Sequence, residues 1–334
     1  MKVLLNGLGR IGKLVLRDLL ETPGGIEIVG VNDASGDAAQ HALLIEFDSV
    51  HGRWSRHVTA EGDGLVVDGT RLALTAHRAL ADLPLGGVDA VIDCTGAFKS
   101  EAALEPYFGA GVGSVIVSAP VRDGGALNLV YGVNHDRYDG SQRLLTAASC
   151  TTNCLAPIVA VLRDAFGIRH GSFTTIHDVT NTQTIVDRPH KDPRRARSAL
   201  MNLIPTTTGS AKAIMQIFPD LEGRLMGHAV RVPLLNASLT DCAFELDRPI
   251  TAEAANDAFR AAEAGAMAGI LGVEDRPLVS SDFVNDRRSA IVDAPSTVVV
   301  QGTHLKLYAW YDNEFGYAVR LADIARMVAA RRAS

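Results

Sequence analysis

The chain of 334 residues is 47% hydrophobic and 21% charged, which is the composition of a soluble globular protein with room for two domains of ordinary size. Its net charge of -6 argues against nonspecific binding to nucleic acid, so an anionic ligand must be held by local arginines and helix N-termini. Because glycine and arginine come too early for a signal peptide and no run of about 18 apolar residues exists, we expect a cytoplasmic protein without a membrane partner.

The first part of the chain alternates short β-rich runs with helical or loop segments, which is the rhythm of βαβ units around a parallel sheet. These runs are residues 3–5, 26–31, 88–94, 114–118 and 127–133. After about residue 170 the expected strands are longer and alternate in hydropathy, as in a mixed or antiparallel sheet. They cover residues 172–177, 229–235, 238–246 and 305–311. Residues 315–332 have an amphipathic pattern that predicts a C-terminal helix docked by its apolar stripe.

Gly7, Gly9 and Gly12 form a G-x-G-x-x-G motif between an expected strand and an expected helix. The motif alone is weak, but in this βαβ context the glycines permit a tight turn and the close approach of a pyrophosphate to the helix N-terminus. Asp33 ends the next strand, where its carboxylate can accept hydrogen bonds from an adenosine ribose and repel a 2′-phosphate. We therefore predict a Rossmann-type domain that binds NAD rather than NADP. The alternative is a plain glycine turn beside a solvated acidic loop.

Cys150 comes directly after an expected strand and opens an apolar, helix-like segment. The free amides and macrodipole of a helix N-terminus favour an anion, so this position predicts a thiolate with a lowered pKa and a nucleophilic role. The alternative is a small core residue, as we expect for Cys94 and Cys242. Cys154 is expected to pack one turn deeper, although it could trap an oxidised Cys150 as a disulfide. Pro157 predicts a kink, or a helix that begins close to Cys150.

His177 is the histidine that the pattern places best to serve Cys150 as a base. It follows the extended stretch 173–176 and precedes a polar loop, as expected for a catalytic side chain at a strand end. The alternative is a structural histidine. Asp178 is not expected to orient the His177 ring, because successive strand residues point to opposite faces of a sheet.

Several segments have the composition of an anion site. Residues 205–210 read as a hydroxyl-rich helix N-cap suited to phosphate. Further hydroxyls flank the thiol, at Ser149, Thr151 and Thr152. Arg231 lies in an otherwise apolar strand, so we expect it to face an anion or a carboxylate. The basic stretch 188–197 offers further charge, with a solvated loop of salt bridges as its plainer interpretation.

Five segments together make a highly specific set: Asn6–Gly12, Ala148–Pro157, Thr208–Gly209, Arg231–Pro233 and Trp310–Tyr317. In these segments the chain resembles the phosphorylating glyceraldehyde-3-phosphate dehydrogenases, and the resemblance extends over nearly its whole length. It implies an α/β fold with three parts: an NAD-binding Rossmann domain at 1–149, an α+β catalytic domain at 150–314, and a final helix at 315–334 that returns to the first domain. It also implies a glycolytic homotetramer, in which the loop from about 180 to 201 packs near a neighbour's cofactor. No metal site is expected.

By this resemblance Cys150 attacks the aldehyde with His177 as base, hydride passes to the nicotinamide, and inorganic phosphate cleaves the thioester to an acyl phosphate. The residues that match the site for the substrate's own phosphate are Thr180, Thr182 and Arg231. Those that match the site for the attacking phosphate are Ser149, Thr151, Arg195, Thr208 and Gly209. Those that match cofactor positions are Gly7, Gly9, Arg10, Ile11, Gly12, Asp33, Arg78, Thr95, Ser118, Asn313 and Tyr317.

Departures from the common pattern concern the exact activity. Residues 51–54, 180–184 and 234–237 are more similar to a branch associated with arsenate resistance and an efflux permease, where arsenate replaces phosphate and gives 1-arseno-3-phosphoglycerate. Arg188 stands where NAD-specific relatives commonly have a small or apolar residue, and it could tolerate the 2′-phosphate of NADP.

Three alternatives stay open at this point. An erythrose-4-phosphate dehydrogenase has the same thiol chemistry but releases its thioester to water. A binding protein or regulator without catalysis is disfavoured by the intact set of Cys150, His177 and Arg231. Aspartate-semialdehyde dehydrogenase is disfavoured because the matches around Cys150 and at 310–317 are to the sugar-phosphate family.

Overall fold

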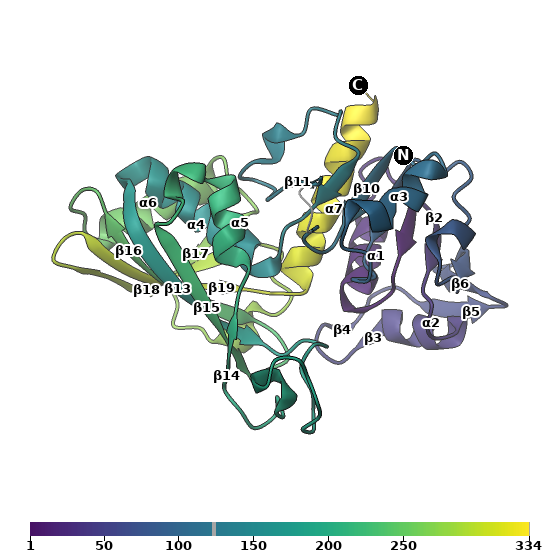
Figure 1. The fold of residues 1–334 in the computed structure, drawn as a ribbon, viewed down its shortest axis with the longest axis horizontal. Coiled ribbons are helices and arrows are strands. Elements are labelled where there is room, and N and C mark those ends of the chain that lie inside the picture. Colours follow the sequence, from purple (N-terminus) through teal and green to yellow (C-terminus); the bar gives the residue numbers. More distant parts are fainter. Residues whose placement is uncertain (122–124, 334) are drawn as a thin grey trace. The chain divides into compact units, whose positions relative to one another are not determined.

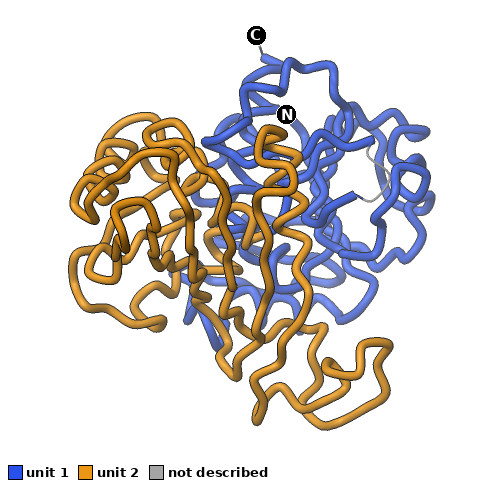
Figure 2. The backbone as a smooth tube through the Cα atoms, turned by 60° about the vertical axis from the view of Figure 1, so that its left-hand side comes forward, with its two compact units in different colours: residues 1–149, 317–334 blue, residues 150–316 orange. Residues whose placement is uncertain are grey.

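The structure is a computed structural model that describes residues 1–121 and 125–333. The chain forms two compact units, which Figure 2 shows in different colours: residues 1–149 together with the C-terminal residues from 317 onward, and residues 150–316. No helix in the described part of the chain is long and apolar enough to cross a membrane.

The first unit is built on a parallel sheet with the strand order β11-β12-β10-β9-β1-β2-β8 (Figure 1). Its strands are β1 (Lys2–Asn6), β2 (Glu27–Asn32), β8 (Leu74–Thr75), β9 (Ala90–Asp93), β10 (Ser114–Val117), β11 (Leu127–Asn128) and β12 (Leu144–Thr146). The helices of this unit are α1 (Arg10–Glu21), α2 (Ala38–Glu46), α3 (Glu101–Gly109), α7 (Phe315–Ala333, from 317 onward) and the 3-10 turns η1 (Leu80–Asp82) and η2 (His135–Arg137). Short antiparallel strands between α2 and β8 are β3 (Phe47–Asp48), β4 (Gly52–Arg53), β5 (Val58–Glu61), β6 (Gly64–Val67) and β7 (Thr70–Leu72).

The central strands of this sheet are apolar on both faces, because a parallel sheet is covered on both sides. Val3, Leu4 and Leu5 of β1 are buried, as are Val91 and Ile92 of β9. Successive strands pair in parallel, as the alternation of β-rich and helical segments predicts. The expected α/β fold class is confirmed.

One expected strand is much shorter than its hydropathy indicates. The sequence predicts a strand at 127–133, but β11 covers only Leu127–Asn128. Beyond it the side chain of Asn134 accepts a hydrogen bond from the backbone N–H of Val130 (2.7 Å) and donates one to the carbonyl of Asn128 (3.1 Å). The chain therefore turns here, and its buried apolar side chains give a strand-like pattern without a ladder.

Helix α7 packs on the first unit through the apolar stripe that its sequence indicates. The stripe is fully buried, at Leu321, Ile324, Ala325 and Val328. Its flank is held by Arg326, which forms an ion pair with the buried carboxylate of Asp18 and donates to the carbonyl of Thr22 (2.8 Å). The last helix is thus tied to the first helix of the same unit.

The second unit is a mixed sheet with the strand order β14-β15-β13-β16-β19-β18-β17. Its strands are β13 (Ile168–Asp178), β14 (Ile204–Thr207), β15 (Leu225–Val232), β16 (Ser238–Leu246), β17 (Leu271–Glu274), β18 (Ala290–Val300) and β19 (His304–Tyr311). Its helices are α4 (Cys150–Phe166), α5 (Ser210–Ile217), α6 (Ala252–Ala264) and the 3-10 turns η3 (Arg194–Ala196), η4 (Pro219–Leu221) and η5 (Ser280–Phe283).

The register of this sheet determines which side chains meet. Parallel pairing of β13 with β15 sets His177 opposite Arg231, and antiparallel pairing of β16 with β19 sets Ser238 opposite Tyr311. Pro157 predicts either a kink or a helix that begins close to Cys150. The structure shows the second, because helix α4 begins at Cys150 and runs on through Pro157.

The sequence predicts a helix N-cap at residues 205–210, but residues 205–207 lie in a strand instead. Residues Ile204–Thr207 form strand β14, and α5 starts only at Ser210 with Gly209 as its N-cap and no side-chain cap. The β-branched threonines pair with β15, as residues of high strand propensity tend to do.

Candidate functional site

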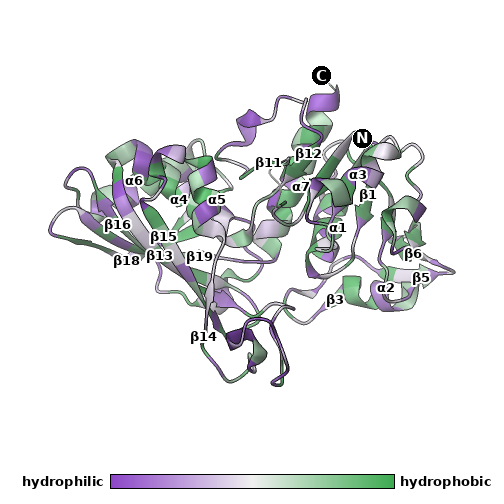
Figure 3. Ribbon diagram, in the orientation of Figure 1, coloured by the Kyte–Doolittle hydropathy of each residue, from purple (hydrophilic) through white to green (hydrophobic). Residues whose placement is uncertain are grey.

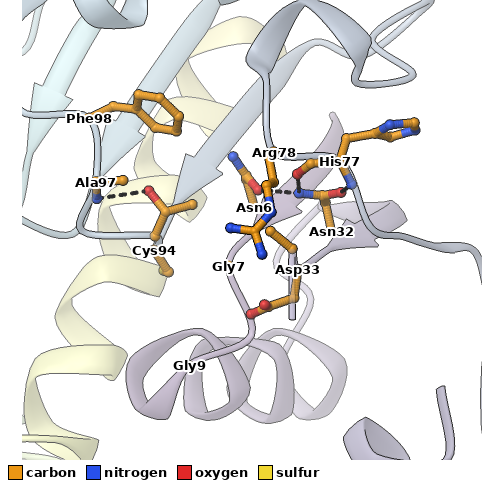
Figure 4. A pocket seen from close by; sticks show the side chains of 12 residues that line it. Asn6, Gly7, Gly9, Asn32, Asp33, His77, Arg78, Cys94, Ala97 and Phe98 are labelled. Atoms are coloured by element: carbon orange, nitrogen blue, oxygen red, sulfur yellow. Dashed lines mark hydrogen bonds between the residues drawn. The ribbon is translucent and has the colours of Figure 1, made fainter. Parts of the chain in front are cut away.

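A cavity of about 300 Å³ lies in the first unit at the carboxyl ends of β1, β2 and β9. Several residues expected at the cofactor line it: Gly7, Gly9, Asp33, Arg78 and Thr95. Figure 4 shows Asp33 and Arg78 near the turn that contains Gly7 and Gly9. Doubly wound sheets bind nucleotides in this crevice beyond the strand ends.

The three glycines of the motif have different reasons to be glycine. Gly7 has φ +97°, and a Cβ there would lie 2.7 Å from the backbone carbon of Cys94. A Cβ on Gly12 would lie 1.8 Å from the carbonyl oxygen of Gly7. A Cβ on Gly9 would meet no protein atom within 4 Å, so it would enter the cavity instead. This open space at the N-terminus of α1, where no side chain caps the helix, fits the pyrophosphate of a dinucleotide.

The carboxylate of Asp33 is held at this turn by two backbone groups. It accepts hydrogen bonds from the N–H of Leu8 (2.7 Å) and of Ser35 (2.9 Å). Each oxygen keeps a lone pair that can accept a ribose hydroxyl. The ribose contact that the sequence predicts for Asp33 stays a prediction.

A polar network that runs from the cavity-lining Thr95 to buried side chains was not predicted from the sequence. Thr95 donates its hydroxyl to Asp93 (2.7 Å), and Asp93 also accepts from the hydroxyl of Tyr107 (2.8 Å). Asn6 donates to the same Tyr107 oxygen (2.6 Å). Burial raises the pKa of Asp93. Asn6, next to the glycine motif, was the sequence signal for this network; a local sequence pattern does not show which strand residue a tyrosine on α3 will contact.

Other expected cofactor residues do not line this cavity. Arg10 forms an ion pair with Asp48 (2.5 Å), and Ile11 lies partly buried in the first turn of α1. The backbone N–H of Ser118 donates to a β9 carbonyl (2.9 Å). Tyr317 is buried and donates its hydroxyl to the carbonyl of residue 148 (3.3 Å).

The second unit brings Cys150 and His177 together. The sulfur of Cys150, at the first residue of α4, lies 3.4 Å from Nε2 of His177, near the end of β13. Nδ1 of the same ring lies 2.8 Å from the backbone carbonyl oxygen of Asp178. When Nδ1 donates to this carbonyl, Nε2 carries the lone pair that faces the sulfur. The ring is thus oriented by the backbone carbonyl of Asp178 and, as expected, not by its carboxylate.

The ionisation of this pair differs from the sequence prediction. Burial raises the pKa of Cys150, against the lowering effects of the Arg231 charge and of the N–H of Thr151. The predicted lowering of the Cys150 pKa is therefore wrong for this structure, because the loss of solvent outweighs the helix N-terminus. Burial, and then the charge of Arg231, lower the pKa of His177 to about 3. A neutral thiol thus faces a neutral imidazole that can accept its proton.

Arg231 contacts a backbone carbonyl and the His177 ring rather than a carboxylate, and its expected role toward an anion stays a prediction. Its Nη1 donates to the carbonyl of Asp178 (2.9 Å) and lies 2.6 Å from Nδ1 of His177. No carboxylate within the described ranges pairs with it, and its buried Nε has no hydrogen-bond partner there. An arginine with unused donors next to the thiol pair is suited to bind an anionic substrate.

The loop between β13 and β14 supplies further donors, and it is largely purple, hence hydrophilic, in Figure 3. The hydroxyls of Thr180 and Thr182 lie 2.9 Å apart, and Arg195 donates to Thr182 (3.1 Å). The sequence assigned Arg195 to the other anion group, so the structure joins residues of both predicted sites. Arg195 also lies close enough to Arg231 to lower its pKa, after burial as the main cause.

The remaining anion-site candidates are placed as follows. Thr208 donates its hydroxyl to Ser210 (3.1 Å) just before α5, beside the exposed Gly209. Thr151 is buried, and its hydroxyl contacts Tyr311 (3.0 Å); both its backbone N–H and its hydroxyl lie close enough to the Cys150 thiol to lower its pKa. Ser149 is the last residue before α4 and belongs to the first unit.

Tyr311 is a site residue to which the sequence gave no role. Its hydroxyl contacts those of Thr151 (3.0 Å) and Thr175 (2.7 Å), and its ring packs edge-on against His177 with centroids 6.2 Å apart. It thereby fixes the start of α4 and the base together. Its position in the alternating strand 305–311 was visible in the sequence, but its contacts depend on the sheet register.

A Rossmann-type nucleotide-binding unit combined with a cysteine–histidine pair is the arrangement of a dehydrogenase that works through a thiol. Comparison with known protein families matches residues 149–313 to the model "Glyceraldehyde 3-phosphate dehydrogenase, C-terminal domain" and residues 1–101 to "Glyceraldehyde 3-phosphate dehydrogenase, NAD binding domain".

Among curated relatives, glyceraldehyde-3-phosphate dehydrogenase 3 of a Nostoc species is 54% identical over 333 residues, which is 98% of each chain. Glyceraldehyde-3-phosphate dehydrogenase 1 of Bacillus subtilis and the glyceraldehyde-3-phosphate dehydrogenase of Geobacillus stearothermophilus are each 45% identical over 334 residues, or 99% of each chain. The chain belongs to the glyceraldehyde-3-phosphate dehydrogenase family. It is an oxidoreductase with that family's NAD-binding domain.

Proposed function

We propose that this protein oxidises D-glyceraldehyde 3-phosphate with NAD and phosphate to 1,3-bisphosphoglycerate. The observation that carries the proposal is the Cys150 sulfur at 3.4 Å from Nε2 of His177, next to an arginine with unused donors. Gly7, Gly9, Asp33, Arg78 and Thr95 are the residues that would hold the cofactor, together with the other cofactor positions named from the sequence. When bound, NAD supplies the acceptor for the hydride of the substrate aldehyde.

The chemistry of the chain's own groups follows from this geometry. His177 takes the thiol proton at Nε2 while the sulfur forms a bond to the aldehyde carbon, and it returns this proton to the aldehyde oxygen as the C=O π bond opens to the thiohemiacetal hydroxyl. The ring, neutral again, then takes the proton of this hydroxyl as the substrate is oxidised. After oxidation, the acyl group stays on Cys150 as a thioester. An oxyanion then attacks the carbonyl carbon, the carbon–sulfur bond breaks, and the thiolate is regenerated. Thr180, Thr182 and Arg231 would hold the substrate's phosphate, while Ser149, Arg195, Thr208, Gly209 and the Thr151 N–H would hold the attacking oxyanion.

The test is NADH formation from glyceraldehyde 3-phosphate with phosphate omitted or added. We expect turnover that requires phosphate, and its loss in Cys150→Ser with cofactor binding retained. Steady turnover without any oxyanion, with faster oxidation of erythrose 4-phosphate, would instead select the non-phosphorylating erythrose-4-phosphate dehydrogenase. Turnover retained in Cys150→Ser would sink the thiol role.

Arsenate is the second candidate for the attacking oxyanion. It has the charge and tetrahedral shape of phosphate, so the hydroxyl and arginine donors described above fit both. The segments 51–54, 180–184 and 234–237 support the arsenate branch, in which the product is 1-arseno-3-phosphoglycerate. Comparison of kcat/KM for the two oxyanions, with the arsenate tolerance of a deletion strain, decides between them. Unchanged tolerance on deletion would remove the arsenate role.

NAD is the proposed cofactor because Asp33 lies at the ribose end of the cavity. A 2′-phosphate there would meet a carboxylate that already has two backbone donors, and like charges repel. Arg188 is exposed and is the residue that would favour some use of NADP. Initial rates with both cofactors test this, since a higher kcat/KM for NADP would overturn it.

We also propose a cytoplasmic homotetramer, as the family resemblance implies, and the apolar side chains that both units expose support self-association. In the second unit the exposed set is Ile185, Val186, Leu200, Met201 and Leu203, and in the first unit it is Leu43, Leu44 and Phe47, on and just after α2, which is largely green in Figure 3. Met201 alone is 85% exposed. Such patches mark interfaces, and a second copy of the chain would cover them. Sedimentation equilibrium should give four chains, and Met201→Glu should weaken the assembly; a monomer at micromolar concentration would contradict the proposal.

A further inference from the structure

Asp178 is a buried acid next to the catalytic base that the chemistry above does not use. It is the last residue of β13, has 0% exposure, and neither of its carboxyl oxygens has a hydrogen-bond partner among the described residues. Its side chain points to the face opposite His177, because neighbours on a strand alternate. An ionised carboxylate without partners is strongly disfavoured in such a place. Burial raises the pKa of Asp178 to about 7, so its proton is exchangeable near neutrality.

A chain of buried polar groups leads from Asp178 to Asn313. The backbone N–H of Asp178 donates to Oγ of Ser238 (3.2 Å), and the Ser238 hydroxyl donates to Oδ1 of Asn313 (2.9 Å). Ser238 and Asn313 are 1% and 5% exposed. The Ser238 hydroxyl also lies close enough to the Asp178 carboxyl to lower its pKa. Ser238 therefore lies between the carboxyl group of Asp178, which can lose its proton, and the side-chain amide of Asn313, whose oxygen and nitrogen ends can exchange by rotation.

The other charged groups around Asp178 come from the neighbouring strands. Asp312 and Glu314, at and beyond the end of β19, raise its pKa, and Arg231 on β15 lowers it. His177 on β13 itself is neutral above about pH 3.

We propose that Asp178 is a positioning residue whose proton sets the direction of the Ser238 hydroxyl, and thereby the end of the Asn313 amide that is offered to the cofactor. This inference rests on the proposed function, in which Asn313 contacts NAD. The carboxamide of the nicotinamide is the part of the cofactor that an amide side chain can match with complementary hydrogen bonds.

The two protonation states direct the hydroxyl differently. When Asp178 is protonated, its O–H donates to Ser238, the Ser238 hydroxyl donates to Oδ1 of Asn313, and the Nδ2 group remains free to donate to the ligand. When Asp178 releases its proton to solvent, the Ser238 hydroxyl turns to the new carboxylate. Oδ1 of Asn313 then loses its donor, and the amide is no longer held in one orientation.

The first test measures NAD binding by calorimetry between pH 5.5 and 9. We expect the Kd of the wild-type protein to rise about three- to tenfold through pH 7, the worth of one hydrogen bond. Asp178→Asn should bind with a pH-independent Kd near the low-pH value, because its amide always donates to Ser238. Ser238→Ala should bind weakly at every pH. Asp247→Asn, at an exposed carboxylate, is the matched control and should follow the wild type.

The second test observes the proton directly. In the difference spectrum of wild type minus Asp178→Asn, the infrared C=O band of a buried carboxylic acid should be present at pH 6 and should disappear through pH 7; the contribution of Asp93, another buried acid with a raised pKa, cancels in this difference. An unchanged pH dependence of the Kd in Asp178→Asn, or no such band at pH 6, would overturn the inference. If the pH response is present but glyceraldehyde 3-phosphate is not oxidised, the proposed function fails and the inference about Asp178 stands.

Discussion

Arg231 affects the two members of the thiol pair in different ways. Its charge opposes burial at Cys150, where it lowers the pKa, and reinforces burial at His177, where it also lowers the pKa. A substrate phosphate bound to Arg231 would neutralise this charge and so raise the pKa of His177. The imidazole would then be a stronger base when the substrate is in place than when it is not.

Arg231→Leu should therefore affect the phosphorylated substrate selectively. We expect kcat/KM for glyceraldehyde 3-phosphate to fall about 10- to 100-fold, since a charge-assisted hydrogen bond contributes about 1.5–3 kcal/mol. The value for unphosphorylated glyceraldehyde should change much less. Arg224→Leu, an exposed arginine just before the same strand, is the control. Equal losses on both substrates would show that Arg231 acts on the thiol pair and not on the substrate phosphate.

The buried Asp178 also makes stability depend on pH. Its folded pKa of about 7 lies above the ordinary 3.8, so the unfolded chain releases this proton first as pH rises. The free energy of unfolding is thus lowered progressively between about pH 4 and 7, and the penalty stays constant above 7. His177, whose folded pKa lies below its ordinary value, contributes in the opposite sense between about pH 3 and 6.5.

Asp178→Asn should remove the fall in the free energy of unfolding that Asp178 causes between about pH 4 and 7. We expect the midpoint of thermal unfolding of the variant, relative to wild type, to increase between pH 4 and 7 and to remain level above pH 7. Because one pKa unit corresponds to about 1.4 kcal/mol, the gain should be on the order of a few kcal/mol. A difference that is constant from pH 4 to 8 would contradict the raised pKa.

At the level of residues, the sequence predicts what depends on local position. Cys150 at a helix start and His177 at a strand end were recognisable because turn, strand and helix patterns are local. The roles of Tyr311 and Asp178 were not, because they depend on the pairing of strands far apart in the chain. The Cys150 pKa was predicted with the wrong sign, since burial is a property of the folded unit.

The same limit applies at the level of elements. The alternating strands β13, β16 and β19 were predicted at nearly their observed positions, but β14 and β18 were missed. Both contain a proline, Pro205 and Pro295, which argues against a strand. In β18 the register with β19 shifts between Asp293 and Val298, so the ladder is interrupted around the proline and continues beyond it.

Strand β19 and helix α4 are joined through the Tyr311 hydroxyl, which gives the next prediction. Tyr311→Phe leaves the buried Thr151 and Thr175 without this partner, and we expect the free energy of unfolding to fall by about 1–3 kcal/mol. The N-terminal turn of α4 should also exchange its amide hydrogens faster. The same change at the partly exposed Tyr308 of β19 is the control. An unfolding free energy as high as that of the Tyr308 variant would show that the hydroxyl contacts are not stabilising.

At the scale of the whole molecule, the chain returns at its end to the unit in which it began. The carboxylate of Asp18 on α1 is fully buried, and Arg326 on α7 is a cationic partner of it. Arg326 also bonds to the carbonyl of Thr22 and to Asp323. One side chain therefore connects the last helix to the first, and its loss would leave a carboxylate buried without that cation.

Arg326→Ala should destabilise the first unit by about 3–5 kcal/mol, the typical effect of removing one partner of a buried ion pair. Arg332→Ala is the matched control, because its pair with Asp89 joins two side chains that are 41% and 37% exposed and such pairs contribute at most about 1 kcal/mol. Thermal unfolding gives the two energies, and hydrogen exchange over residues 317–333 shows whether the helix is released. Equal effects of the two variants would mean that the apolar stripe alone, and not the buried charge pair, holds the C-terminal helix in place.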